Sequence, residues 1–249
     1  MRKYNTFKTF CLLCAFVFAG FGANAQLKNL EQSIYLNFSL PTAQFNDDVS
    51  TNALGENIPM TRFNVGKAAT AGVGLGYRVS YRFDVGFGEV SPYISGDLHW
   101  NRVQSSLRDE YMNAGDGKSP NYLNIPILIG VNYRYHLTEI FSPFGEFGIG
   151  SDIMFITKEA GNSTTLGEFK MRYKTSANVG WQIGGGCYFG DHVSASIHYN
   201  GFGKHAIQYT DKTEIPQGGG GALVAADASN TGTQSRSIGL LSVKIGFHF

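Results

Sequence analysis

The last fifteen residues of the chain, 235–249, alternate between two kinds of side chain. Apolar residues occupy one set of alternate positions near the end of this segment, at Leu241, Val243, Ile245, Phe247 and Phe249. Successive side chains of a β-strand point to opposite faces, so the two-residue period predicts a strand with one apolar and one mixed face. We therefore expect the chain to end in such a strand.

Seven earlier segments repeat the same period: 33–40, 69–83, 93–101, 122–137, 143–155, 172–189 and 193–199. In the second of them, Gly72, Gly74 and Gly76 fall on the inward face. The alternation runs straight through these glycines, whereas a nucleotide-binding loop requires a turn into a helix. Small residues are instead expected on the crowded inside of a narrow barrel. In the fourth segment Pro126 cannot donate to a strand ladder, and we expect a bulge there.

The outward positions of these eight segments are apolar, and none of them is charged. A charge in the middle of a lipid-facing surface costs about 2–4 kcal/mol, so this pattern indicates a face in contact with lipid. Aromatic residues gather toward the segment ends, where the girdles of a membrane barrel lie. They include Tyr81, Phe83, Trp100, Tyr133, Tyr135, Tyr173, Phe189, Phe247 and Phe249.

The connections between the segments alternate in length. Those after the odd-numbered segments are long, at 41–68, 102–121, 156–170 and 201–236, and those after the even-numbered segments are short. Short periplasmic turns and longer outer loops are typical of transmembrane barrels. The sequence therefore predicts an all-β, eight-stranded antiparallel transmembrane barrel with both termini in the periplasm. Ten strands stay open if the first or last long loop contains a hairpin.

Residues 1–25 have the features of a cleaved secretory signal peptide. Arg2, Lys3 and Lys8 precede an apolar run, and Ala23-Asn24-Ala25 gives a small-residue cleavage site. The apolar run is shorter than the roughly 20 residues that a spanning helix needs. No later stretch is long and apolar enough either, so a closed barrel is the remaining way to span lipid. We expect one domain, 26–249, exported to the outer membrane.

Composition narrows the range of functions. The formal net charge is only +1, which gives no indication of nucleic-acid binding. Beyond the predicted signal peptide, Cys187 is the single cysteine, so an internal disulfide is excluded. No cofactor is expected.

Charged side chains of both signs are expected inside the barrel. The proposed lumen charge network consists of Arg78, Arg82, Asp97, Arg134, Glu146, Asp152, Arg172, Lys174 and Lys244. Buried charges need partners, and an eight-stranded lumen is just wide enough for side chains. A side-chain plug is therefore favoured over a narrow path for small anions.

One short motif suggests chemistry. Residues 198–201 read His-Tyr-Asn-Gly and are similar to the His-Tyr-Ser-Asn segment of outer-membrane lipid A deacylases. Asn200 stands where those enzymes have the serine nucleophile, and an amide cannot replace an activated hydroxyl. We therefore expect no enzymatic activity. His198 and His248 are expected to face inward as neighbours on adjacent strands, but without a third ligand they predict no metal site.

Several segments together resemble the PorT-like family of small outer-membrane β-barrels. They are YLNIPILIGVNYRY, FGEFGIGSDIMF, WQIGGGCYF and the terminal VKIGFHF. The resemblance implies outer-membrane location; one PorT-like protein takes part in secretion of other proteins. Outer-membrane barrels commonly end on an aromatic residue, which makes Phe247 and Phe249 the expected assembly signal.

The expected role is structural or interactive, through the outer loops. The expected partners are outer-membrane lipid and lipopolysaccharide, the barrel-assembly machinery, and surface or envelope proteins, with no nucleic acid. A small pore, a component of an export system and a lipid A-modifying enzyme are the alternatives.

Overall fold

A computed structural model describes residues 29–48, 65–105, 108, 118–163, 167–216, 223–224 and 229–249. The predicted signal peptide, 1–25, lies outside the described residues. Among the described residues, no helix is long and apolar enough to cross a membrane.

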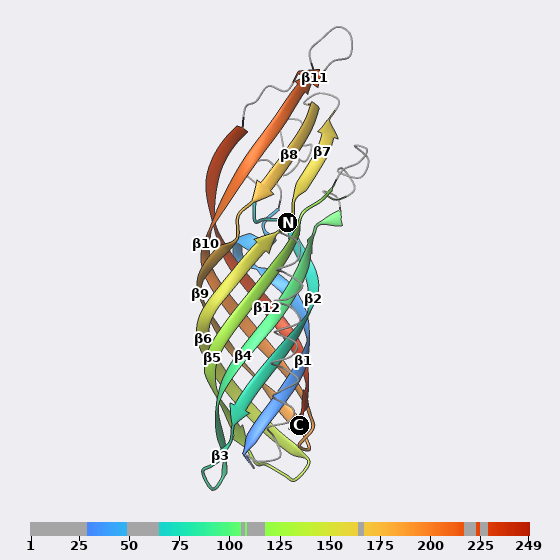
Figure 1. Cartoon of the computed structure of the whole chain (residues 1–249). Coiled ribbons are helices and arrows are strands. Elements are labelled where there is room, and N and C mark those ends of the chain that lie inside the picture. Colours follow the sequence, from blue (N-terminus) through green and yellow to red (C-terminus); the bar gives the residue numbers. More distant parts are fainter. Residues whose placement is uncertain are drawn as a thin grey trace, which may run out of the picture.

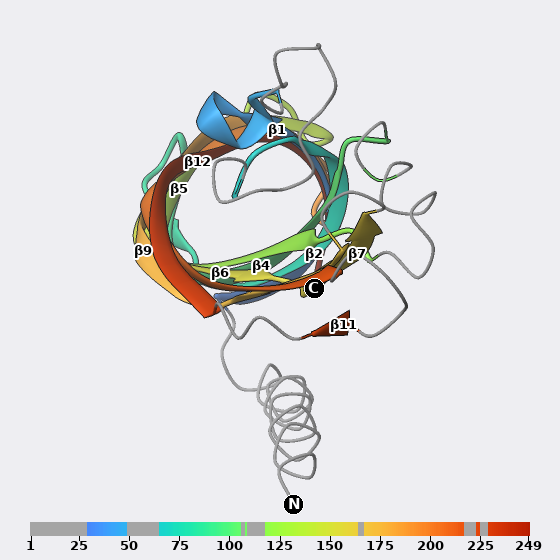
Figure 2. The ribbon, with the colours of Figure 1, turned by 90° about the horizontal axis from the view of Figure 1, so that it is seen from above.

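Eight antiparallel strands form a closed ring, and Figure 2 shows them encircling a central axis. The last of them pairs with the first over ten residue pairs, from Ser33–His248 to Thr42–Gly239. The prediction of an eight-stranded antiparallel barrel is confirmed. The ring strands, in ring order, are β1 (Leu30–Thr42), β2 (Ala69–Tyr81), β4 (Gly88–Val103), β5 (Asn121–Tyr135), β6 (Phe141–Ile156), β9 (Ser176–Phe189), β10 (Val193–Pro216) and β12 (Ser229–His248).

The ring follows from the two-residue period of its strands. Leu75 and Val73 of β2 are more than half exposed on the outside, whereas Arg78 and Ser80 are buried inside. Two inward glycines of β2 allow close approach of the neighbouring strand: a Cβ at Gly74 would overlap the Leu98 carbonyl. The expected small residues therefore line the narrow interior at this level.

The bulge predicted at Pro126 is wrong. The pairs Gly96–Ile127 and His99–Asn124 of β4 and β5 lie in one continuous register, and β6 also pairs past Pro126 without a shift. Register shifts occur instead between Ala69 and Gly72 of β2 and between Gly201 and Lys204 of β10. Gly203 has a φ of 70° there, a conformation that glycine adopts most easily. Phe202 continues the inward phase of Asn200 and is fully buried. Beyond the bulge the inward positions are odd-numbered, as at His205 and Ile207.

The ring strands β10 and β12 continue beyond the barrel and form an extension with three short strands (Figure 1). These are β7 (Glu159–Ser163), β8 (Gly167–Tyr173) and β11 (Leu223–Val224). β8 pairs with β10 and β7 pairs with β8. The connections predicted at 156–170 and 201–236 are therefore partly strands. The extra hairpin lies in the third long connection and leaves the ring at eight strands.

The other end of the barrel carries the C-terminus and the short connections (Figure 1). One of these connections contains the two-residue strand β3 (Phe83–Asp84), which pairs with β4. Long and short connections thus lie at opposite ends of the molecule, as the sequence predicts.

An apolar cluster fills the mouth of the barrel beneath the extension. A short 3-10 helix, η2 (Ala43–Asn46), contributes the fully buried Phe45, whose ring centroid lies 5.0 Å from that of Tyr122. Phe202, Ile207 and Leu240 belong to the same cluster. These apolar side chains cover one end of the lumen.

Candidate functional site

Polar side chains from all eight ring strands meet inside the barrel, and each is at most 6% exposed. Alternate positions of each strand point inward, and one of these positions in each strand holds a side chain of the set. We call this set the lumen network; it consists of Asn37, Arg78, Asp97, Asn132, Glu146, Gln182, His198 and Lys244.

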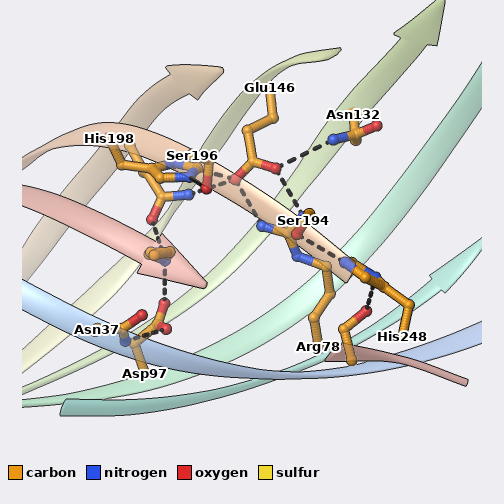
Figure 3. Close-up of polar contacts among 12 residues, drawn as sticks. Asn37, Arg78, Asp97, Asn132, Glu146, Ser194, Ser196, His198 and His248 are labelled. Atoms are coloured by element: carbon orange, nitrogen blue, oxygen red, sulfur yellow. Dashed lines mark hydrogen bonds and ion pairs between the residues drawn. The ribbon is translucent and has the colours of Figure 1, made fainter. Parts of the chain in front are cut away.

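Glu146 accepts hydrogen bonds from three other strands (Figure 3). The Arg78 guanidinium donates to both carboxylate oxygens, at 2.7 and 2.6 Å. Asn132 donates at 3.2 Å and Gln182 at 2.8 Å. His198 Nδ1 lies 3.3 Å from the same carboxylate. Two-pronged arginine–carboxylate pairing is among the stronger polar contacts in proteins.

A second ion pair is connected to the first. Lys244 donates to Asp97 at 3.0 Å, and Asn37 donates to the other Asp97 oxygen at 2.9 Å. Lys244 also donates to Gln182 Oε1 at 3.0 Å. Because Gln182 reaches Glu146 as well, one amide joins the two ion pairs into a single network.

Aromatic rings enclose the buried guanidinium. The Arg78 Cζ lies 5.0 Å from the ring centroid of Tyr35 and 4.0 Å from that of Tyr93. A cation over an aromatic face is attracted by the ring, and more strongly when both are desolvated. The arrangement is a crowded polar layer that links every ring strand to others across the lumen.

Two predicted network residues lie nearer the C-terminal end of the barrel. Arg134 contacts Asp191 at 3.2 Å and stacks over the Tyr188 ring at 4.4 Å. Arg82 is half-buried and lies 3.7 Å from Glu31. Both arginines therefore bind carboxylates outside the lumen network.

Asp152 lies toward the extension end of the lumen. Its carboxylate is 3.1 Å from His205 Nε2, and both side chains are fully buried. His205 Nδ1 also lies 3.2 Å from the Ser176 hydroxyl. The predicted acid is thus paired with a histidine that the predicted network does not include.

Arg172 and Lys174 do not lie in the lumen. Both are exposed, because the predicted strand 172–189 is two strands, β8 ending at Tyr173 and β9 beginning at Ser176. Even-numbered residues such as Ser176 and Gln182 point inward in β9, whereas the odd-numbered Met171 points inward in β8. Both cations project from the outer face of the extension instead.

The two inward histidines are not neighbours. His198 pairs with Ser242 of β12, whereas His248 lies six residues further along that strand. Six strand residues span about 20 Å. Both side chains do face inward, as predicted. Among the described residues, no group of three His, Cys, Asp or Glu side chains is arranged to hold a metal ion.

Ser196, His198 and Glu146 form a chain of polar contacts. The Ser196 Oγ lies 2.7 Å from His198 Nε2, and His198 Nδ1 lies 3.3 Å from Glu146. Nucleophile, base and carboxylate follow this order in serine hydrolases. Here, however, Arg78 binds both carboxylate oxygens, and Ser196 is enclosed in the lumen at 5% exposure. The deacylase motif points to Asn200, two residues after His198, so Ser196, two residues before it, was missed.

The amides of the network were also missed. Asn37, Asn132 and Gln182 occupy inward positions, but an uncharged amide in a strand carries no sequence sign of its partner. Their positions could have been found from the two-residue alternation, because each amide lies between two outward apolar residues of its strand.

No protein-family model matches this chain, and no curated protein matches it. Among solved structures it is similar to the outer membrane protein OprG from Pseudomonas aeruginosa, with 15% identity, a TM-score of 0.43, and coverage of 88% of this chain and 95% of that one. A major outer membrane protein from Thermus thermophilus shows 9% identity, a TM-score of 0.41, and coverage of 88% and 99%. Neisserial surface protein A shows 9% identity, a TM-score of 0.34, and coverage of 88% and 97%. These distant likenesses carry no information on ligand or activity.

Proposed function

We propose that this chain is an outer-membrane β-barrel with a closed lumen, which anchors its strand extension at the cell surface for interaction. The observation that carries the proposal is the uncharged apolar belt around the ring. In this account the barrel is a scaffold, and the extension is the part that meets other molecules.

The belt is formed by large apolar side chains on the outside of every ring strand. Ile94, Ile129 and Val179 are at least 60% exposed, and their neighbours on the same face are also apolar. Water-soluble monomers rarely expose contiguous apolar patches larger than a few hundred Å². A closed ring also satisfies the backbone groups of its strands, which lipid requires.

The two ends of the barrel support an orientation. The end with short connections exposes Asp84, Glu139 and Asp191, and it carries the C-terminus. Membrane barrels have short periplasmic turns and longer extracellular loops. We therefore assign the extension to the cell exterior and both termini to the periplasm.

Accessibility of single cysteines in intact cells tests this orientation. In a Cys187→Ser background, Lys158→Cys should react with a membrane-impermeant maleimide, because Lys158 is exposed at the extension end. Asp191→Cys, in the turn between β9 and β10, should react only after the outer membrane is permeabilised. Equal labelling of both sites in intact cells would contradict the assignment.

We also propose that the chain is not an enzyme. The Ser196–His198–Glu146 chain is enclosed by the lumen network, so a lipid substrate has no route to the hydroxyl in this arrangement. A fluorophosphonate probe should leave Ser196 unmodified in the folded barrel. Labelling that is lost in Ser196→Ala would overturn the proposal.

The family and the partners are part of the same proposal. The strand patterns of the chain support a relation to PorT-like barrels, and the apolar belt supports contact with outer-membrane lipid. The seam between β1 and β12 must close during insertion, so the barrel-assembly machinery is a partner on this account. Lipopolysaccharide and envelope proteins are the partners proposed for the extension.

A further inference from the structure

The outer face of the extension is rich in cations. Arg172, Lys174, Lys204 and Lys212 are exposed on it, contributed by β8, the residue after β8, and β10. Strand pairing brings β8 and β10 together, with Arg172 opposite Thr210. We call these four cations, with the hydroxyl and amide side chains between them, the basic face.

Among the side chains that the structure describes, the charges on the basic face are all positive. Among the described side chains of β8, β10 and β12, the exposed outer positions beyond Tyr199 carry no carboxylate. Asp211 belongs to the other face of the sheet, because it lies opposite the buried Met171. Met171, Ile207 and Tyr209 are buried on the inner face of this sheet, so the exposed cations mark its other side.

A depression lies in the basic face. Its volume is about 340 Å³, and its lining includes Lys174, Gln208, Thr210, Thr231 and Thr233. This volume is near the lower end of the roughly 300–1,000 Å³ found for small-molecule sites. One ammonium group, hydroxyls and an amide suit a ligand that carries both negative charge and many hydroxyl groups.

The position of the face favours one source for such a ligand. Trp181 and Tyr199 are in ring contact at 5.5 Å on the outer surface and mark the upper edge of the apolar belt. Lys204 follows Tyr199 by five residues along β10, and Lys212 lies a further eight residues along. Eight strand residues span about 26 Å, so the cations rise from the lipid headgroup level into the saccharide layer above it.

We infer that the basic face binds the phosphorylated saccharide of lipopolysaccharide in the surrounding outer leaflet. This inference rests on the proposed outer-membrane location and assigns the proposed partner lipopolysaccharide to one face of the extension. Phosphate oxygens accept charge-assisted hydrogen bonds from arginine and lysine, and sugar hydroxyls pair with the threonine and glutamine side chains. The depression at Lys174 receives a sugar ring while the other cations contact phosphates along the strand.

Titration of the purified full barrel in non-ionic detergent tests the inference. The probe is the phosphorylated core oligosaccharide released from lipopolysaccharide, with the same oligosaccharide after enzymatic dephosphorylation as the second arm. The wild-type protein should bind the phosphorylated oligosaccharide, and added salt should weaken this binding. The double variant Arg172→Glu/Lys174→Glu should bind at least about tenfold more weakly, because two charge-assisted contacts become repulsive.

The matched control reverses two exposed cations elsewhere at the same end of the barrel, Arg102→Glu and Lys158→Glu. Arg102 lies on β4, four strands from β10 around the ring. This control should bind like wild type. No binding by wild type, equal losses in both double variants, unchanged binding after dephosphorylation, or preference for a sulfated polysaccharide would each overturn the inference.

Membrane fractionation of the same proteins separates this inference from the proposed function. Binding in detergent by a wild-type protein that does not reach the outer membrane supports the basic face but contradicts the proposed location. Outer-membrane protein that does not bind the oligosaccharide contradicts the basic face alone. Circular dichroism shows whether each variant is folded before its binding is compared.

Discussion

Glu146 connects more ring strands than any other carboxylate of the lumen network. Its partners come from β2, β5, β9 and β10, and the Gln182 amide extends the connection to Lys244 of β12. A buried carboxylate is tolerated because its oxygens are paired and its charge is compensated. Removing its charge should therefore affect the barrel more than removing a charge at either end.

Replacement of Glu146 by Gln tests that expectation at the level of one residue. The variant retains the side-chain shape but leaves Arg78 buried beside an uncharged amide, so it should lose about 3–5 kcal/mol of unfolding free energy. The measurement is urea unfolding of the barrel in lipid vesicles, followed by tryptophan fluorescence.

The double variant Arg78→Met/Glu146→Gln provides the control. It should lose less stability than the sum of the two single variants, because neither buried charge is then left without its partner. Additive losses, or a Glu146→Gln variant as stable as wild type, would show that the ion pair does not stabilise the lumen.

At the scale of elements, β12 closes the ring against β1. The backbone N–H of Gln32 donates to the Phe249 carbonyl at 2.9 Å, and the Phe249 N–H donates back at 3.0 Å. Phe247 and Phe249 lie on the outward face, at 48% and 43% exposure. The end of this strand therefore belongs to both the seam and the outward apolar belt.

Deletion of Phe249 should lower the amount of folded barrel in the outer membrane. The deletion removes the hydrogen bonds with Gln32 and one aromatic side chain of the belt. The decrease should exceed that caused by Lys244→Met, which removes a lumen charge but leaves the seam intact. Immunoblots of unheated outer-membrane fractions report the folded form, and equal levels of the two variants would refute the assembly role.

The ring could be predicted from the sequence because its strands share one uniform apolar face. Residues such as Leu36 and Leu75 must be apolar, and their period fixes both the strand and its inward side. The extension lies beyond the apolar belt, so its outer positions, including Arg172 and Lys212, are polar and resemble loop sequence. The predicted strand 172–189 therefore extends the inward alternation of β9 across the break before Ser176. This extension wrongly places Arg172 and Lys174 in the lumen.

The candidate site was less accessible to sequence reasoning. Inward phase identified Arg78, Asp97, Glu146 and Lys244 as candidates, but it gave no pairings. Lys244 and Asp97, for example, are separated by 147 positions. Pairing across the lumen depends on strand register and side-chain reach, neither of which a local pattern contains. The apolar cluster at the mouth was missed because it joins connecting residues such as Phe45 and Val65 to inward positions of strands that lie far apart in the sequence.

At the scale of the whole molecule, three layers succeed one another along the barrel axis. Paired arginines and tyrosines occupy the C-terminal end, the lumen network spans the middle, and the apolar cluster covers the extension end. An eight-stranded ring leaves room for little more than side chains. We therefore expect a membrane anchor that does not conduct ions and whose extension carries the interaction.

Single-channel recording in planar lipid bilayers tests this account most directly. Purified wild-type barrel should insert without producing stable conductance steps, while a porin recorded in the same bilayers confirms that conducting barrels are detected. Tryptophan fluorescence of the recovered protein verifies that it is folded in lipid. Stable, reproducible open steps from the folded wild-type barrel would contradict the closed lumen.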